Sequence, residues 1–178
     1  PAAADLRAGL DAFARGDNAA ALRELQPLAQ KGDPKAQFML GVMHETGAGL
    51  RKDEAAAAQW YRKAAEQGEP SAQFNLGLYS ELGRAGPVDF AAAAAWYRRA
   101  AAQGHGTAQN NLGSLYYEGR GVPRDLVEAY KWKSLATAAL TDDRRTAAAG
   151  DRDTIAAQLT PAQLDAAKRL VADWRPAR

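Results

Sequence analysis

The stretch AQNNLGSLYYEGRGVPRDLVEAYKW, residues Ala108–Trp132, decides the fold because its framework recurs twice upstream. The interval is 36 residues, as Trp60, Trp96 and Trp132 show. Ten positions are identical in all three copies, namely Gly32/68/104, Ala36/72/108, Gln37/73/109, Leu40/76/112, Gly41/77/113, Gly47/83/119, Asp53/89/125, Ala57/93/129, Trp60/96/132 and Ala64/100/136. A fixed period of this length indicates a repeat protein, in which each copy is one supersecondary unit.

Each unit carries the start and stop signals of two helices. In the first copy Asp33 is a typical N-cap and Pro34 suits the first helical position, so a helix is expected over about 35–46. Gly47 supplies a left-handed stop, and Asp53 begins a second helix over about 54–66. One such hairpin cannot bury its apolar face alone. Stacked hairpins can, which predicts an all-α, right-handed α–α superhelical solenoid.

The composition supports this fold class and excludes several functions. Ala accounts for 43 of the 178 residues, whereas Val and Ile together number six, so strands are disfavoured. The 23 basic and 21 acidic residues are interspersed, which argues against a nucleic-acid-binding face. No apolar run approaches the ~20 residues needed for membrane insertion. The absence of Cys excludes disulfides and thiolate metal sites.

The domain organisation follows from the period. We expect one solenoid domain over 1–178, with a tetratricopeptide-like hairpin at 4–31, three repeats at 32–67, 68–103 and 104–139, and capping helices over 140–178. Thr160–Gln163 reads as a capping box that starts the last helix. The start at Pro1 is interpreted as a mature terminus after signal-peptide removal, with a trimmed start as the alternative.

Two sets of repeated residues are expected to have packing roles. Gly41, Gly77 and Gly113 sit inside helices, where Gly costs ~1 kcal/mol relative to Ala, so a close approach of two helices is expected at each. Trp60 and its two counterparts share a helix face with Ala57 and Ala64. We therefore expect the tryptophans to be the large anchors between adjacent hairpins.

The repeated pattern resembles the Sel-one-like repeat (SLR) family, a branch of the tetratricopeptide superfamily. The resemblance rests on Ala-Gln-x-x-Leu-Gly, then Gly-x-Gly, Asp, Ala and Trp-Tyr-x-x-Ala-Ala-x-x-Gly, and it covers residues 32–139. Two departures stand out: Gly83-Arg84-Ala85 lacks the second loop Gly, and Lys133 replaces the usual Tyr. The resemblance implies a superhelix whose first helices line a concave groove.

A second apolar face is expected to line that groove. At 100° per residue, Phe38 and Val42 lie about 160° either side of Leu40, away from the hairpin core. The partner-binding face predicted from this phase comprises Leu6, Leu10, Phe13, Phe38, Val42, Glu45, Phe74, Leu78, Glu81, Asn110, Ser114 and Tyr117. It is apolar in its N-terminal half and polar toward Tyr117. The alternative is that tight curvature buries Phe38 and Phe74 as core.

No constellation in the sequence indicates catalysis. His44 and His105 are the only histidines, and neither has metal-ligand spacing. The Gly-rich turns lack the Lys-Ser/Thr of a phosphate loop. A Ser-x-x-Lys motif is missing after Ser71, Ser80, Ser114 and Ser134. We therefore expect no enzyme activity, no cofactor and no metal.

The resemblance implies a non-enzymatic interaction or adaptor module that binds a peptide or protein on its concave groove. The localisation common among family members, the N-terminal residues and the Ala- and Arg-rich composition favour a protein of the bacterial envelope, periplasmic or secreted rather than cytoplasmic. We also expect a monomer. Two alternatives are a toxin-neutralising immunity protein and a cell-wall or β-lactam-binding hydrolase.

Overall fold

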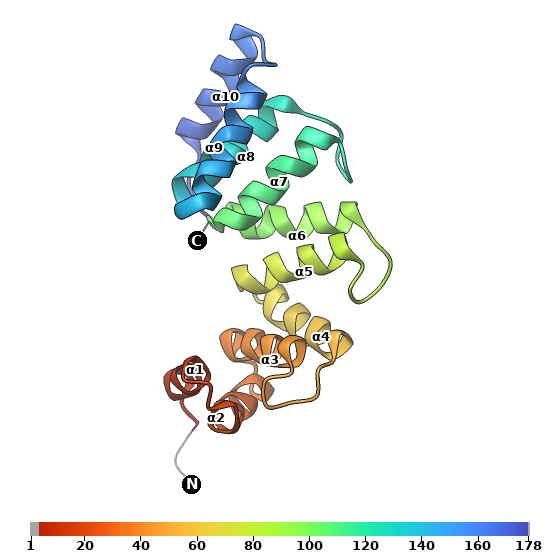
Figure 1. Ribbon diagram of the computed structural model, residues 1–178, viewed down its shortest axis with the longest axis vertical. Coiled ribbons are helices and arrows are strands. Elements are labelled where there is room, and N and C mark those ends of the chain that lie inside the picture. Colours follow the sequence, from red (N-terminus) through yellow and green to blue (C-terminus); the bar gives the residue numbers. More distant parts are fainter. Residues whose placement is uncertain (1–3, 178) are drawn as a thin grey trace.

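The computed structural model describes residues 4–177, and in that range it contains helices without strands. Figure 1 labels them α1 (Leu6–Ala14), α2 (Asn18–Gln30), α3 (Pro34–Thr46), α4 (Glu54–Glu66), α5 (Pro70–Leu82), α6 (Phe90–Ala102), α7 (Gly106–Glu118), α8 (Leu126–Ala139), α9 (Asp142–Ala156) and α10 (Pro161–Asp173). Pro1, Ala2 and Ala3, on which the interpretation of a mature terminus rests, lie outside the described residues.

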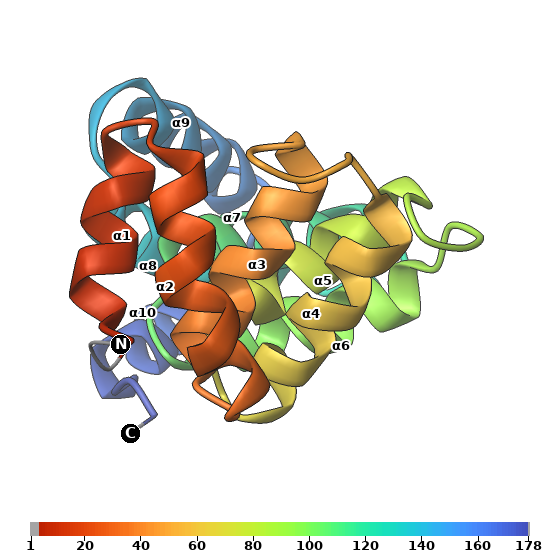
Figure 2. The same cartoon turned by 90° about the horizontal axis from the view of Figure 1, so that it is seen from below.

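The helices form a superhelical stack of hairpins, which confirms the predicted solenoid. Helices α1 to α9 pack chiefly against their neighbours in the chain, whereas α10 folds back onto α8. In Figure 1 the N-terminal hairpin lies at one end of the stack and α9 and α10 lie at the other. The view along the stack in Figure 2 shows successive hairpins rotated relative to one another, which gives the stack its curvature.

Local signals place the helix ends where the sequence predicts them. The Asp33 side chain accepts a hydrogen bond from the Ala36 N–H at 2.8 Å, and Asp53 does the same for Ala56 at 2.9 Å. Gly47 adopts the left-handed conformation with φ of 77°. Thr160 and Gln163 form the expected capping box. The bounds of each hairpin thus follow from short-range hydrogen bonding.

Two of the three repeated helix-interior glycines, Gly41 and Gly77, face tyrosines rather than tryptophans. A Cβ at Gly41 would lie 2.5 Å from the Tyr61 ring, and one at Gly77 would lie 2.5 Å from the Tyr97 ring. The expected close approach is therefore present at both positions, and the group that requires it is an aromatic ring.

The prediction that the tryptophans are the principal anchors is wrong for the first two units. Tyr61 and Tyr97 are fully buried, whereas Trp60 and Trp96 are only half-buried. Trp60 packs on the α1–α3 cluster, and Trp96 packs on the α4–α5 cluster. Adjacent helix positions differ by only 100°, so the sequence pattern could not decide which aromatic residue of each pair turns inward.

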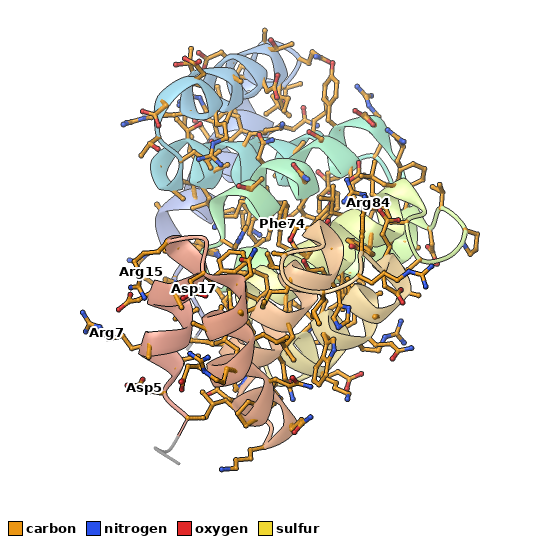
Figure 3. The ribbon with its side chains drawn as sticks, turned by 60° about the horizontal axis from the view of Figure 1, so that its bottom comes forward. Asp5, Arg7, Arg15, Asp17, Phe74 and Arg84 are labelled. Atoms are coloured by element: carbon orange, nitrogen blue, oxygen red, sulfur yellow. The ribbon has the colours of Figure 1, made fainter. Side chains whose placement is uncertain are left out.

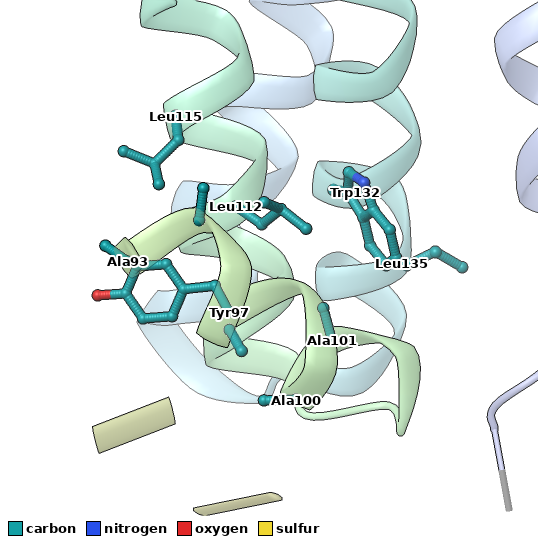
Figure 4. Close-up of a cluster of buried hydrophobic side chains, with 10 residues drawn as sticks. Ala93, Tyr97, Ala100, Ala101, Leu112, Leu115, Trp132 and Leu135 are labelled. Atoms are coloured by element: carbon teal, nitrogen blue, oxygen red, sulfur yellow. The ribbon is translucent and has the colours of Figure 1, made fainter. Parts of the chain in front are cut away.

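Trp132 is the tryptophan that behaves as expected. It is buried with Leu112, Leu115 and Leu135 in the cluster that joins α6, α7 and α8. Figure 4 shows Trp132 and Leu135 on one helix and Tyr97 on another, with Leu112 between them. The indole N–H donates to Glu128 Oε2 at 2.9 Å, so its one polar group is satisfied.

Within residues 4–177, none of the helices has the length and apolar character needed to cross a membrane.

Candidate functional site

The predicted groove residues lie on the first helix of each hairpin, and their exposure is uniform. Every one is half-buried, neither in the core nor fully exposed. They comprise Leu6, Leu10 and Phe13 on α1, Phe38, Val42 and Glu45 on α3, Phe74, Leu78 and Glu81 on α5, and Asn110, Ser114 and Tyr117 on α7. Side chains of this kind form part of the packing and part of an accessible surface.

The two groove phenylalanines each rest on the buried tyrosine of their own unit. The Phe38 and Tyr61 ring centroids are 5.8 Å apart, and those of Phe74 and Tyr97 are also 5.8 Å apart. Phe74 additionally stacks on His105 at 4.8 Å. The rings are thus held rigidly from behind. In Figure 3 Phe74 lies toward the middle of the stack, away from Asp5, Arg7, Arg15 and Asp17 at its N-terminal end.

The groove carboxylates accept hydrogen bonds from the same tyrosines. The Tyr61 hydroxyl donates to Glu45 Oε2 at 2.6 Å, and the Tyr97 hydroxyl donates to Glu81 Oε2 at 2.5 Å. Burial, together with the adjacent carboxylate, raises the pKa of both tyrosines. Burial, aided by Glu45 and Glu54, also raises the pKa of Tyr79, to about 12. These phenols are therefore neutral at pH 7, and Tyr61 and Tyr97 serve as donors.

Glu45 and Glu81 differ in whether their second carboxylate oxygen remains free to accept a hydrogen bond. Arg84 donates to the second oxygen of Glu45 at 2.6 Å, which ties the first unit to the loop of the second. Its counterpart one unit on, Arg120, pairs with Glu118 instead, at 2.9 Å. Among residues 4–177, the second oxygen of Glu81 therefore has no hydrogen-bond partner. Glu81 is the groove carboxylate that is free to accept a bond from a ligand.

The C-terminal end of the groove is built around a buried lysine. Lys133 is only 2% exposed, and its ammonium donates to Asn110 Oδ1 at 3.0 Å, Ser114 Oγ at 2.8 Å and Asp151 Oδ2 at 2.7 Å. A buried charge requires such compensation. Beside this cluster lies a pocket of about 190 Å³, lined by Ser114, Tyr117, Glu118, Lys133, Asp151, Thr154 and Ile155.

This cluster places a serine hydroxyl next to a lysine, a contact that linear spacing did not reveal. The arrangement does not make Ser114 a nucleophile, however. An ammonium that donates to three acceptors has no lone pair with which to take the serine proton. No group of three or more His, Cys, Asp or Glu in the described range is placed to hold a metal ion.

His105 is a capping residue. Its Nδ1 accepts from the Ala108 N–H at 3.2 Å, the role that Asp33 has in the first unit. Burial lowers the pKa of His105, which keeps the imidazole neutral and its lone pair available.

The comparisons with known proteins agree with this architecture. The Sel1 repeat family model matches residues 34–69, 70–105 and 106–139, so every boundary except the last, at residue 139, lies two residues later than the Gly32 period predicts. A comparison with curated protein sequences gives no significant match.

Two solved structures are similar over most of the chain. One is c5321, described as a protective antigen present in uropathogenic Escherichia coli strains and displaying an SLR fold, with 37% identity and a TM-score of 0.75 over 87% of this chain and 32% of that chain. The other is a Sel1 repeat protein from Oxalobacter formigenes, with 33% identity and a TM-score of 0.80 over 89% of this chain and 61% of that chain. This chain thus spans less than two thirds of either. It belongs to the Sel1-repeat family, whose repeats generally mediate protein–protein interaction.

Proposed function

We propose that this protein is a non-enzymatic adaptor that captures an extended or helical polypeptide on the face formed by α1, α3, α5 and α7. The observation that carries the proposal is the shared half-burial of all the predicted groove residues. Held from behind and accessible in front, they present a preorganised surface, which lowers the ordering cost of binding.

The chemistry of the surface changes along the stack, which favours one orientation of the ligand. Leu6, Leu10 and Phe13 begin an apolar stripe that continues through Phe38 and Phe74. Next, Glu81 offers a free acceptor, and the pocket beside Lys133 offers polar walls. The matching ligand presents apolar side chains at one end and an N–H donor or a cation at the other.

A peptide-display library screened against the purified protein tests this proposal. Leu78→Glu places a charge on the apolar stripe, and we expect selected peptides to lose at least tenfold in affinity by calorimetry. Leu170→Glu, at an exposed leucine on α10, is the matched control and should bind like the wild type. Equal binding by the Leu78→Glu variant, shown to be folded by circular dichroism, would contradict the proposal.

The absence of catalysis is part of the proposal. Family members are generally non-catalytic adaptors. The engaged ammonium of Lys133 supports the same role here. Saturable hydrolysis of nitrocefin or peptidoglycan by the purified protein would overturn it.

We also propose that the protein works in the bacterial envelope. The support is the Ala- and Arg-rich composition together with the resemblance to the family. Osmotic-shock fractionation of the native host, followed by immunoblotting, should recover the protein with periplasmic markers. Recovery with cytoplasmic markers alone would place it elsewhere.

A further inference from the structure

A ladder of buried glutamines runs along the turns that join successive hairpins. Gln37, Gln73 and Gln109 are all buried at equivalent positions. Each Nε2 donates to the backbone carbonyl eight residues earlier, and all three bonds measure 3.1 Å. This shared bond fixes the orientation of each amide and directs each Oε1 away from that carbonyl.

In the first two units this oxygen accepts from a second glutamine. Gln67 Nε2 donates to Gln37 Oε1 at 2.7 Å, and Gln103 Nε2 donates to Gln73 Oε1 at 2.9 Å. Gln103 Nε2 also donates to the Gly68 carbonyl at 2.9 Å. One primary amide nitrogen, with its two hydrogens, thus satisfies two acceptors.

The third unit lacks the second glutamine. Its counterpart is Ala139, whose side chain cannot donate. Among residues 4–177, Gln109 Oε1 consequently has no hydrogen-bond partner, although the residue is only 1% exposed. A buried acceptor without a partner is unusual, and a ligand that supplies a donor would relieve it.

A cavity of about 270 Å³ lies beside this amide. Its walls include Leu135, Ala138 and Ala139 at the end of α8, and Trp174 and Pro176 from the segment after α10. That segment is tied down, because the Ala177 N–H donates to the Ala102 carbonyl at 2.8 Å. The side-chain walls are mostly apolar, which favours a ligand with carbon atoms next to its donor over water alone.

We propose that this cavity is a binding site for a primary carboxamide, and specifically for a glutamine side chain of a partner polypeptide. The amide N–H would donate to Gln109 Oε1, as Gln67 and Gln103 do for the equivalent oxygens in the preceding units, once the cavity walls that cover this buried oxygen shift aside. The methylene groups would lie against Leu135 and Trp174. The site is separate from the proposed groove, since none of the twelve groove residues lines it.

The test is a titration of ¹⁵N-labelled protein with N-acetyl-L-glutamine methylamide, followed by NMR. We expect saturable shifts of the Gln109 side-chain amide and the Trp174 indole at millimolar ligand. The matched probe, N-acetyl-L-glutamate methylamide, has a carboxylate in place of the carboxamide and should leave both signals unmoved. Equal shifts with both probes, or none with either, would overturn the proposal.

A variant supplies the missing amide from the chain itself. Ala139→Gln should raise the melting temperature by completing the ladder, and it should abolish the carboxamide-specific shifts. Ala95→Gln, at an exposed position on α6, is the control and should bind the probe like the wild type. Undiminished binding by the Ala139→Gln variant would show that the probe occupies another site.

Discussion

The first two units and the third solve the same packing problem in different ways. Gly41 and Gly77 each receive a tyrosine ring whose hydroxyl donates to a glutamate of the same hairpin. Gly113 instead faces the aliphatic stem of Lys133, 3.0 Å from a Cβ built on the glycine. The counter-charge of Lys133 comes from Asp151, which lies on α9 outside the repeat.

This difference shows how the stack is closed. The buried tyrosine of an internal unit finds its acceptor within the same hairpin, so this contact can be repeated without change. The third unit carries a buried cation that requires α9 beside it. We infer that this ion pair, of which the Asp151 side chain is 56% exposed, helps to specify where the capping helix docks, a role that ionic contacts can serve even where they add little net stability.

The largest expected effect contrasts the two aromatic residues of one unit. Tyr97→Ala should lower the free energy of unfolding by about 3–5 kcal/mol, because it removes a fully buried ring and leaves a cavity. Trp96→Ala should cost clearly less, since that side chain is half-buried. Urea denaturation followed by circular dichroism measures both. A larger loss for Trp96→Ala would restore tryptophan as the anchor.

The next effect concerns the third unit. Asp151→Ala leaves the Lys133 ammonium without its anion, and we expect a loss of about 1–3 kcal/mol. This expected loss is smaller than for a fully buried ion pair, because the Asp151 side chain is 56% exposed. Adding Lys133→Met should recover most of the loss, since an apolar chain of similar length needs no counter-charge. If the double variant is less stable than Asp151→Ala, the ion pair is not the link between α8 and α9.

The smallest effect depends on pH. Folding lowers the pKa of His105 from its ordinary 6.5, so below pH 6.5 the unfolded chain binds protons more readily than the folded one. Stability from this group is therefore complete above pH 6.5 and is lost as the pH falls through the folded pKa. The melting temperature should decline from pH 7 to pH 5, and His105→Asn, which retains a cap, should weaken the decline. An unchanged slope would assign the effect to other groups.

The parts of the structure that the sequence predicts are those set by neighbouring residues. Asp33, Gly47 and Thr160 mark helix ends through local hydrogen bonds. The 36-residue period then predicts that equivalent hairpins repeat along the chain and stack. The choice between Trp96 and Tyr97 depends on the rotation of a helix against its neighbour, which no local signal encodes.

The candidate site also contains some features that the sequence predicts and others that it does not. The phase of the groove residues can be read from a helical wheel, whereas the Lys133–Asp151 pair joins a repeat to a cap and has no periodic signal. The glutamine ladder was detectable in principle. Gln37 and its two counterparts are polar residues identical in all copies, and their burial requires partners.

The most direct test of the central claim is to map a bound peptide onto the chain by NMR. With a library-selected peptide, the largest backbone shifts should fall on α3, α5 and α7, around Phe38, Leu78 and Tyr117, with little change on α4 and α6. Shifts concentrated on α4 and α6, with the first helices undisturbed, would contradict capture on the proposed groove.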